Sequence, residues 1–290
     1  MARQPRTLAG KVVVITGGGR GIGAATASAL ARQGALVAIG DLDLDVAKQT
    51  ADDLGGDAIA LPLDVTDLAG FTRFLDEVEQ QLGPIDVLIN NAGIMPIGML
   101  ADESDRSTRH QLEINLHAVI HGTREAVLRM RPRGSGHIVN IASAAGKAGF
   151  PGVATYCATK HGVVGLSEAV RMELRGTGVE VSVVMPAIVR TELTSGVEDA
   201  RFIKSITPED VAGAIVKALL RPRFEVYVPA SLGPINRFTR ALLPRRVAEG
   251  IVRALKGDQV MVNAAHSAAR KDYEARADAS APAADREPAK

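Results

Sequence analysis

The 290-residue sequence has few of the features that cross-link a protein or hold it in a membrane. Its single cysteine, Cys157, excludes an internal disulfide and a multi-cysteine zinc or iron–sulfur site, and we expect no metal. No uninterrupted run of about 18 apolar residues is present, so no membrane-spanning helix is expected. The opening MARQPRTLAG lacks a secretory apolar core, because Lys11 interrupts the stretch that follows. We expect a cytoplasmic protein.

The sequence also lacks an excess of either charge. Lysine and arginine number 34 against 33 aspartate and glutamate residues, a net charge of +1, so no general nucleic-acid-binding surface is expected. Hydrophobic residues make up 46% and charged residues 23%, which is typical of a globular chain rather than a disordered one. A chain of this length forms one large domain or two small ones.

Short β-branched runs alternate with helical patterns along most of the chain. Most of the runs are almost continuously apolar, which is typical of parallel strands covered on both faces. We expect seven strands, at Lys11–Thr16, Ala35–Asp41, Ala58–Leu63, Val87–Asn90, His137–Ile141, Val179–Met185 and Glu225–Val228. The alternation predicts one doubly wound α/β domain over residues 1–232, with a seven-stranded parallel sheet flanked by helices.

Three segments depart from this alternation. Residues Thr191–Ser205 form a long loop of mixed composition, which we interpret as a lid. Residues 233–275 are expected to form a helical extension, whose basic amphipathic stretch 235–256 is broken at Pro244. This stretch is favoured as a lid or subunit contact, and contact with an anionic membrane surface is the alternative. Residues 276–290 are rich in alanine, proline and charge, and we expect a disordered tail.

A glycine-rich loop follows the first predicted strand. The sequence Thr16-Gly-Gly-Gly-Arg-Gly-Ile-Gly23 has the spacing TGxxxGxG and lacks the Gly-Lys-Ser/Thr ending of an ATP-binding loop. Glycines there allow a tight turn and let backbone amides approach a pyrophosphate at the start of the next helix. The candidate residues for dinucleotide binding are Gly17, Arg20, Gly21, Ile22 and Gly23.

Asp41 ends the second strand about 20 residues after these glycines. A carboxylate at that place accepts hydrogen bonds from the adenosine ribose and repels the 2′-phosphate of NADP. Arg20 favours the opposite choice, because its guanidinium can pair with that phosphate. We expect the carboxylate to dominate and predict NAD, with NADP as the alternative.

Two polar side chains lie four residues apart at the start of a later predicted helix, which places Tyr156 and Lys160 on one face. A nearby ammonium stabilises a phenolate, so we expect the pKa of Tyr156 to be lowered, as suits a general acid/base. Ser143 follows a strand at the ligand-binding edge of the sheet and can hold a substrate oxygen. Asn115 lies on the preceding helix and can hold a water behind Lys160.

Together these residues resemble the short-chain dehydrogenase/reductase family over about residues 8–230. The matching motifs are TGGGRGIG, Asp41, Leu63-Asp-Val65, Asn90-Asn-Ala-Gly93, Asn115, Ser143, Tyr156-Cys-Ala-Thr-Lys160 and Pro186-Ala-Ile-Val-Arg-Thr191. The resemblance implies a Rossmann-type sheet and hydride transfer with a nicotinamide dinucleotide. It implies catalytic roles for Asn115, Ser143, Tyr156 and Lys160.

The resemblance also implies how the rest of the cofactor is held. Asp64 and Val65 are expected at the adenine, Asn91, Ala92 and Gly93 along the cofactor floor, and Ile188 and Thr191, with Tyr156 and Lys160, near the nicotinamide ribose. One departure is Pro186-Ala187 where the family usually has Pro-Gly, which adds a methyl group beside the nicotinamide. A homodimer or homotetramer is the family expectation.

The substrate is indicated only by apolar segments. Ile94, Met95, Pro96, Ile97 and Met99 can form one wall of a substrate site, and Phe150, Pro151, Val153 and Ala154 another, although core packing explains both equally well. We predict a secondary alcohol or ketone that is bulky and apolar. The amphipathic stretch Ile235–Leu255, including Leu242-Leu-Pro-Arg-Arg246, resembles the C-terminal extension of family members that act on retinoids, steroids and other lipids, which implies a substrate of that kind. The alternatives are a dinucleotide-binding redox sensor without chemistry and a peripheral protein of lipid surfaces.

Overall fold

The computed structural model describes residues 5–197, 205–235, 259–265 and 267–280, with residues 239, 244, 246, 247 and 250 between them. Most of the predicted amphipathic stretch 235–256, half of the predicted lid and residues 281–290 lie outside the described part of the chain. No helix within the described ranges is long and apolar enough to cross a membrane.

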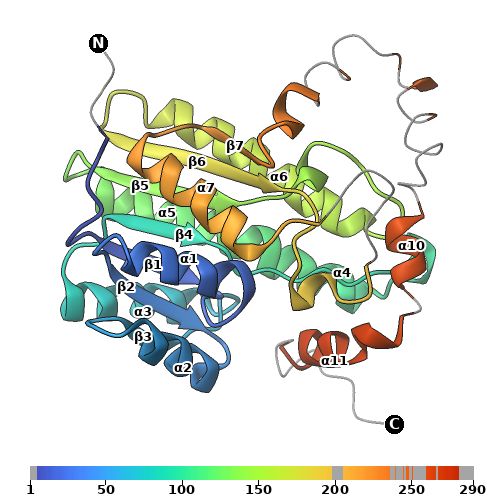
Figure 1. The fold of residues 1–290 in the computed structure, drawn as a ribbon, viewed down its shortest axis with the longest axis horizontal. Coiled ribbons are helices and arrows are strands. Elements are labelled where there is room, and N and C mark those ends of the chain that lie inside the picture. The colour runs from blue at the N-terminus through green and yellow to red at the C-terminus, as the bar shows by residue number, and fades with distance from the viewer. Residues whose placement is uncertain are drawn as a thin grey trace.

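Seven parallel strands form one sheet in the order β3-β2-β1-β4-β5-β6-β7 (Figure 1). They are β1 (Val12–Thr16), β2 (Leu36–Asp41), β3 (Ile59–Pro62), β4 (Val87–Asn90), β5 (Gly136–Ile141), β6 (Val179–Pro186) and β7 (Glu225–Val228). Each differs from its sequence prediction by no more than one residue at either end. The chain order reverses between β1 and β4, and ligands bind beyond the carboxyl ends of strands at such a point.

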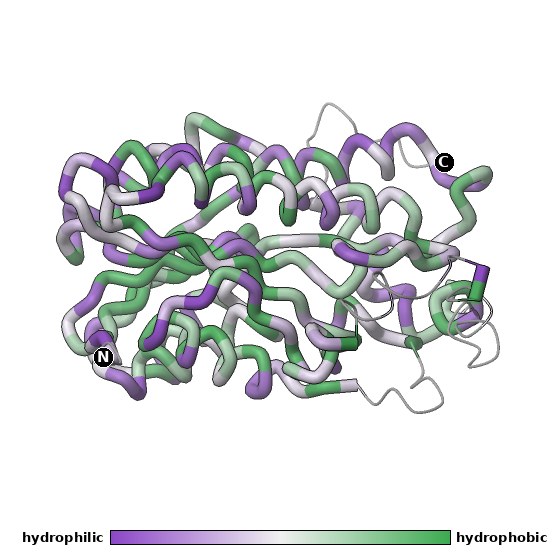
Figure 2. Tube along the Cα trace, turned by 90° about the horizontal axis from the view of Figure 1, so that it is seen from above, coloured by the Kyte–Doolittle hydropathy of each residue, from purple (hydrophilic) through white to green (hydrophobic). Residues whose placement is uncertain are grey.

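Helices cover both faces of the sheet, as the two outer layers in Figure 2 show. One face carries α1 (Gly21–Ala31), α2 (Leu44–Leu54) and α7 (Pro208–Leu220), and the other carries α3 (Leu68–Leu82), α5 (Ala118–Met130) and α6 (Ala154–Glu173). Coverage on both faces explains why all five residues of β1 are buried. The predicted doubly wound α/β architecture is confirmed.

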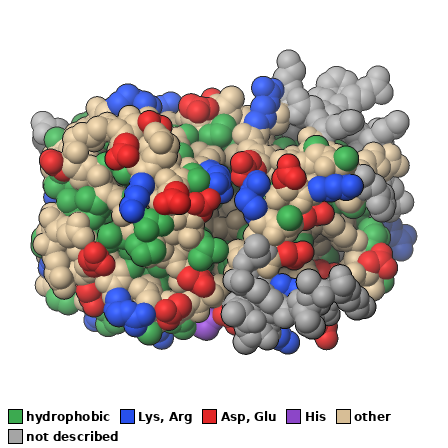
Figure 3. Space-filling model, turned by 90° about the horizontal axis from the view of Figure 1, so that it is seen from below, with side chains coloured by type: hydrophobic (Ala, Val, Ile, Leu, Met, Phe, Trp, Pro, Cys, Tyr) green, Lys and Arg blue, Asp and Glu red, His purple; other side chains and the backbone are tan. Residues whose placement is uncertain are grey.

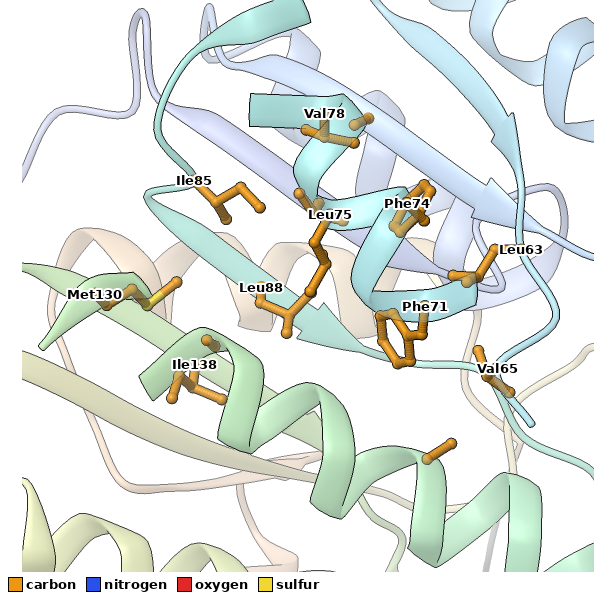
Figure 4. Close-up of a cluster of buried hydrophobic side chains, with 14 of the residues drawn as sticks. Leu63, Val65, Phe71, Phe74, Leu75, Val78, Ile85, Leu88, Met130 and Ile138 are labelled. Carbon is orange, nitrogen blue, oxygen red and sulfur yellow. The ribbon is translucent and has the colours of Figure 1, made fainter. Parts of the chain in front are cut away.

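Separate hydrophobic clusters hold these layers to the sheet. In the cluster between α3, α5 and the sheet, Phe71 and Leu75 pack toward Leu88 and Ile138 (Figure 4). On the opposite face, side chains of α1, α2 and α7, such as Leu30 and Ile215, pack on the other side of the same strands. These buried side chains fix the strand ends that carry the site described below.

Two helices have ends or turns that bear on function. Thr207 caps α7 by accepting from the Asp210 amide while the Asp210 carboxylate accepts from the Thr207 amide, as the Thr-Pro-Glu-Asp sequence predicts. The helix that leads to β5 comprises α4 (Asp105–Leu112), one π-helical segment, η2 (Glu113–His117), and α5. A π-helical turn inside an α-helix frequently marks a functional site, and this one contains Asn115.

The C-terminal segment returns to the sheet domain. It contains α10 (Val260–Ala264), the 3₁₀ turn η5 (Ala268–Arg270) and α11 (Lys271–Ala279), which lie on the side to which the strands point (Figure 1). The predicted disordered tail from residue 276 is therefore wrong for residues 276–279, which are helical. The reason is tertiary packing, because Tyr273 and Ala277 of α11 are buried against the domain.

Candidate active site

A cavity of about 900 Å³ opens beyond the carboxyl ends of the strands. A hollow is visible near the centre of the face in Figure 3, with acidic and basic side chains mixed around it. Of the predicted site residues, the cavity is lined by Gly17, Arg20, Gly21, Ile22, Asp41, Asp64, Val65, Asn91, Ala92, Gly93, Ser143, Tyr156, Lys160, Ile188 and Thr191. The two that do not line it, Gly23 and Asn115, lie directly behind it.

The glycine loop joins β1 to α1 and bends tightly over the sheet. Gly17 and Gly21 have positive φ angles of 63° and 54°, which side chains other than glycine rarely adopt. A Cβ atom at Gly23 would collide with the Gly17 carbonyl oxygen and lie 2.8 Å from the Gly18 Cα atom. No side chain caps the start of α1 and no acidic residue lies in its first turn. Its amides and positive helix end suit a pyrophosphate.

Asp41 lies at the end of β2, beside this loop. Its carboxylate accepts hydrogen bonds from the Gly19 amide at 2.8 Å and the Asp43 amide at 3.1 Å. Arg20 forms an ion pair with Asp43, with 2.7 Å between Nη2 and Oδ2. The arginine that favours NADP in the sequence is therefore engaged by a neighbouring carboxylate, and a second carboxylate, Asp41, lies against the same glycine loop.

Ser143, Tyr156 and Lys160 meet at one wall of the cavity. Ser143 follows β5, and Tyr156 and Lys160 lie in the first two turns of α6. The Lys160 Nζ atom lies 5.6 Å from the centre of the Tyr156 ring and donates a hydrogen bond to the Ile141 carbonyl at 2.9 Å. The Ser143 Oγ atom accepts from the Ala145 amide at 3.1 Å, so its own proton is available to another acceptor.

Burial governs the ionisation of this group. Only 8% of Tyr156 and 4% of Lys160 are exposed. Burial raises the pKa of the Tyr156 phenol, and a hydrogen bond with Ser143 only partly opposes it. Burial is thus the largest cause of the shift, and its direction is opposite to the lowered pKa that the sequence suggests. The support of Tyr156 by Lys160 stays a prediction. Burial also lowers the pKa of Lys160 to about 8.

Asn115 fixes the backbone next to Lys160. Its side-chain amide exchanges two hydrogen bonds with the Ile94 backbone, each 2.8 Å long, and the side chain is fully buried. A Cβ atom at Gly93 would lie 3.1 Å from the Asn115 Oδ1 atom and 3.7 Å from Lys160 Nζ. Asn115 is therefore separated from Lys160 by one glycine, and its role in a water-linked relay stays a prediction.

Other predicted residues form hydrogen bonds that keep the loops of the cavity floor in place. The Asn91 side chain donates to the Thr16 and Gly17 carbonyls at 3.0 and 2.8 Å, which ties the floor to the glycine loop. Asp64 accepts from the Thr66 amide at 2.8 Å and keeps its loop in place. At the other end, the Ala187 amide donates to the Val228 carbonyl at 2.8 Å. Alanine is thus accommodated in this backbone.

The two predicted apolar walls are only partly at the cavity. Ile94, Met95, Phe150 and Val153 line it, whereas Met99 is 51% exposed. Pro96 and Ile97 line a separate, smaller pocket. Sequence reasoning missed the contribution of the C-terminal segment, from which Val260, Met261, Tyr273, Arg276, Ala277 and Ser280 line the main cavity. No local signal marks these residues, because their contacts span most of the chain.

Comparisons with known proteins agree with this geometry. Residues 11–201 match the family model described as short chain dehydrogenase. The ketoacyl reductase HetN of Nostoc sp. is 38% identical over 260 residues, which cover 88% of this chain and 89% of that protein. A 3-alpha-(or 20-beta)-hydroxysteroid dehydrogenase of Mycobacterium tuberculosis is 35% identical over 213 residues, covering 72% of this chain and 82% of that protein.

A solved structure shows the same fold with a bound cofactor. The crystal structure of a short chain dehydrogenase/reductase from Burkholderia phymatum in complex with NAD superposes with a TM-score of 0.74 at 28% identity. The match covers 81% of this chain and 94% of that one. With the glycine loop, the Ser143–Tyr156–Lys160 group and the sheet order, these matches show that the chain belongs to the short-chain dehydrogenase/reductase family of oxidoreductases.

Proposed function

We propose that this protein is an NAD-dependent dehydrogenase that interconverts a bulky, apolar secondary alcohol and its ketone. The observation that carries the proposal is the cavity itself. One end has a glycine loop and an acidic β2 terminus, the middle has Ser143, Tyr156 and Lys160, and the far end is walled by apolar side chains. This order of groups along one cavity supports binding of a dinucleotide next to a substrate.

The residues at the middle of the cavity suit hydride transfer coupled to proton transfer. A bound nicotinamide dinucleotide supplies the hydride acceptor for alcohol oxidation and the hydride donor for ketone reduction. In alcohol oxidation the Tyr156 phenolate takes the proton of the alcohol, and in ketone reduction the Tyr156 hydroxyl gives its proton to the ketone oxygen. The Ser143 hydroxyl, which is hydrogen-bonded to Tyr156 in this structure, turns to hold that same oxygen and orients the reacting carbon.

The charge of Lys160 supports the tyrosine. Because the pKa of Lys160 is about 8, this buried side chain is mostly protonated at pH 7. Its ammonium stabilises the phenolate form of Tyr156, for which burial alone is unfavourable. The Lys160 ammonium donates one hydrogen bond to the Ile141 carbonyl, and its other two N–H groups can donate to a ribose hydroxyl or a water.

Asp41 and the Arg20–Asp43 ion pair support NAD over NADP. A 2′-phosphate at this place would meet the Asp41 carboxylate and would compete with Asp43 for Arg20. The relative from Burkholderia phymatum is titled as a complex with NAD, which agrees with this choice. We expect the same residues to hold the adenosine ribose of NAD here.

The lining of the far end supports an apolar substrate. Met95, Phe150, Val153, Leu193 and Met261 surround it, and small polar substrates need converging polar groups instead. The relatives include a hydroxysteroid dehydrogenase and a ketoacyl reductase, whose names indicate ring-shaped and acyl substrates respectively. We favour a substrate of steroid or long-chain lipid size. A cytoplasmic location and a dimer or tetramer stay predictions.

The decisive experiment is turnover of a panel of secondary alcohols and ketones by the wild type and Tyr156→Phe, each with NAD and NADP. The panel contains small cyclic alcohols, hydroxysteroids and 3-hydroxyacyl thioesters. We expect kcat to fall at least about 100-fold in Tyr156→Phe while NADH affinity stays within about threefold, because only the proton donor is removed. Tyr227→Phe, in β7 and away from the cavity, is the matched control.

Other results point to other functions. Full activity in Tyr156→Phe would remove this tyrosine from the mechanism. Tight NADH binding without turnover of any alcohol or ketone would favour the dinucleotide-binding redox sensor. A preference for NADP would mean that Arg20 outweighs Asp41 at the ribose.

A further inference from the structure

The side chain of Arg270, in the C-terminal segment, is completely buried. Its Nη1 atom donates to the carbonyls of Leu193 and Ser195 at 3.1 and 3.0 Å, and its Nη2 atom donates to the Met95 carbonyl at 2.8 Å. Its Nε atom pairs with Glu274 at 3.1 Å. One guanidinium thus joins the loop after β4 to the loop after β6, and both loops line the cavity.

Tyr273 lies next to this guanidinium and faces the cavity. Its ring centre is 5.0 Å from the Arg270 Cζ atom, and its hydroxyl accepts a 2.7 Å hydrogen bond from the Met95 amide. Both backbone polar groups of Met95 are therefore bound by α11 and the turn before it. The Tyr273 side chain lines the same cavity as Tyr156 and leaves its own hydroxyl proton available.

Close packing indicates that this arrangement leaves little room for adjustment. A Cβ atom at Gly196 would lie 2.6 Å from Ser267 and 3.2 Å from the Arg270 Cγ atom. A Cβ atom at Gly152, before α6, would lie 3.3 Å from the Val262 amide nitrogen. The loops before α6 and after β6 therefore pack so closely on the C-terminal segment that neither glycine could carry a side chain without a shift. Met261 packs on the cluster that contains Tyr156.

We propose that Arg270 is a positioning residue and Tyr273 a substrate-contacting residue that together determine specificity for large substrates. Arg270 holds the two loops at a fixed separation and keeps Tyr273 against Met95. Tyr273 and Met261 then form a third wall of the substrate site, in which Met261 packs beside Phe150 and Val153. This inference rests on the proposed dehydrogenase activity and adds the residues that set its substrate size.

The test compares Arg270→Met, Arg270→Lys and Tyr273→Phe with the wild type on one small cyclic alcohol and one steroid-sized alcohol. In Arg270→Met we expect KM for the large alcohol to rise at least about tenfold, with kcat for the small alcohol and NADH affinity within about twofold. Arg270→Lys keeps the charge but cannot span both loops, so its effect is intermediate. Lys271→Met, a change at an exposed neighbour in α11, is the control and should leave KM for the large alcohol and kcat for the small alcohol unchanged.

A second measurement does not depend on turnover. Hydrogen exchange of the Met95 amide, measured by mass spectrometry on peptides over residues 93–99, should accelerate at least about tenfold in Arg270→Met and Tyr273→Phe but not in Lys271→Met. If Arg270→Met fails to fold, the exchange rate of the Met95 amide is compared between the wild type and Arg270→Lys and Tyr273→Phe instead. Unchanged exchange overturns the proposal, and so does faster exchange with unchanged selectivity. Absence of turnover in the wild type contradicts the proposed function instead. The exchange result then still tests whether Arg270 and Tyr273 hold the backbone of Met95.

Discussion

The Asp41 carboxylate binds the glycine loop and is also the residue we expect at the adenosine ribose. Its two backbone hydrogen bonds hold the carboxylate in place before any ligand arrives. Asp43, two residues later, holds Arg20 in an ion pair in which both side chains are about two-fifths exposed. We therefore expect cofactor choice to depend on two carboxylates that both disfavour a 2′-phosphate.

This arrangement predicts a switch of cofactor by two substitutions. Asp43→Asn should release Arg20 for a 2′-phosphate, and Asp41→Ala should remove the repulsion. We expect each to raise the NADP-to-NAD ratio of kcat/KM by about tenfold, and the double variant by more than the product of the two. Steady-state kinetics with both cofactors measure the ratio. A double variant that still prefers NAD would show that the ribose is selected elsewhere.

At the scale of single strands and helices, most of the site is predictable from local sequence. Ser143 and Asp41 lie at strand ends, and strand ends follow from apolar runs that the structure reproduces to within one residue. Tyr156 and Lys160 share a helix face because they are four residues apart. The direction of the pKa shift of Tyr156 is not predictable in this way, because its burial depends on Met95 and Ala145, which come from other segments.

His137 in β5 gives the sheet a sensitivity to acid. Only 3% of it is exposed, its Nε2 atom pairs with the Ser182 Oγ atom at 2.8 Å, and burial lowers its pKa to about 3. Between pH 6.5 and 3 the unfolded chain binds a proton that the folded chain does not, so stability falls as pH falls.

We therefore expect the unfolding free energy to drop by up to about 1.4 kcal/mol per pH unit more steeply in wild type than in His137→Gln across this window. Urea denaturation at pH 7, 6, 5 and 4 measures the slopes. Val139→Ala, a change in the same strand that removes no titratable group, serves as the control and should keep the wild-type slope. Equal slopes in wild type and His137→Gln would assign the acid sensitivity to other groups.

At the scale of the whole molecule, cofactor binding should stabilise every layer at once, because the cavity draws on residues from both sides of the sheet. A ligand present at 100 times its Kd adds about 2.7 kcal/mol to the unfolding free energy. For a chain of this size, that corresponds to a rise of about 4–5 °C in Tm.

Thermal unfolding with and without NADH measures this rise. Gly23→Ala should abolish it, because a methyl group at Gly23 collides with the Gly17 carbonyl of the glycine loop. Gly213→Ala, in α7, adds a methyl group with nothing within 4 Å and should keep the full shift. An equal shift in both variants would place the NADH site away from the glycine loop.

Long-range contacts set the limit of sequence prediction at this scale. Arg270 and Tyr273 reach Met95 across 175 and 178 residues, and neither stands in a recognisable motif. Composition alone predicted disorder from residue 276, whereas α11 continues to Ala279 since the domain surface buries its apolar side. The cofactor half of the cavity comes from local motifs, and part of the substrate half comes from an unmarked segment.

The position of α11 along the chain has a consequence during synthesis. The glycine loop, Asp41 and the catalytic group all leave the ribosome before residue 161, and the last strand of the sheet before residue 229. The wall that contains Tyr273 emerges about 45 residues after that strand, so every residue we expect at the dinucleotide is synthesised before this wall of the substrate site. The order of synthesis therefore separates the two halves of the cavity in time.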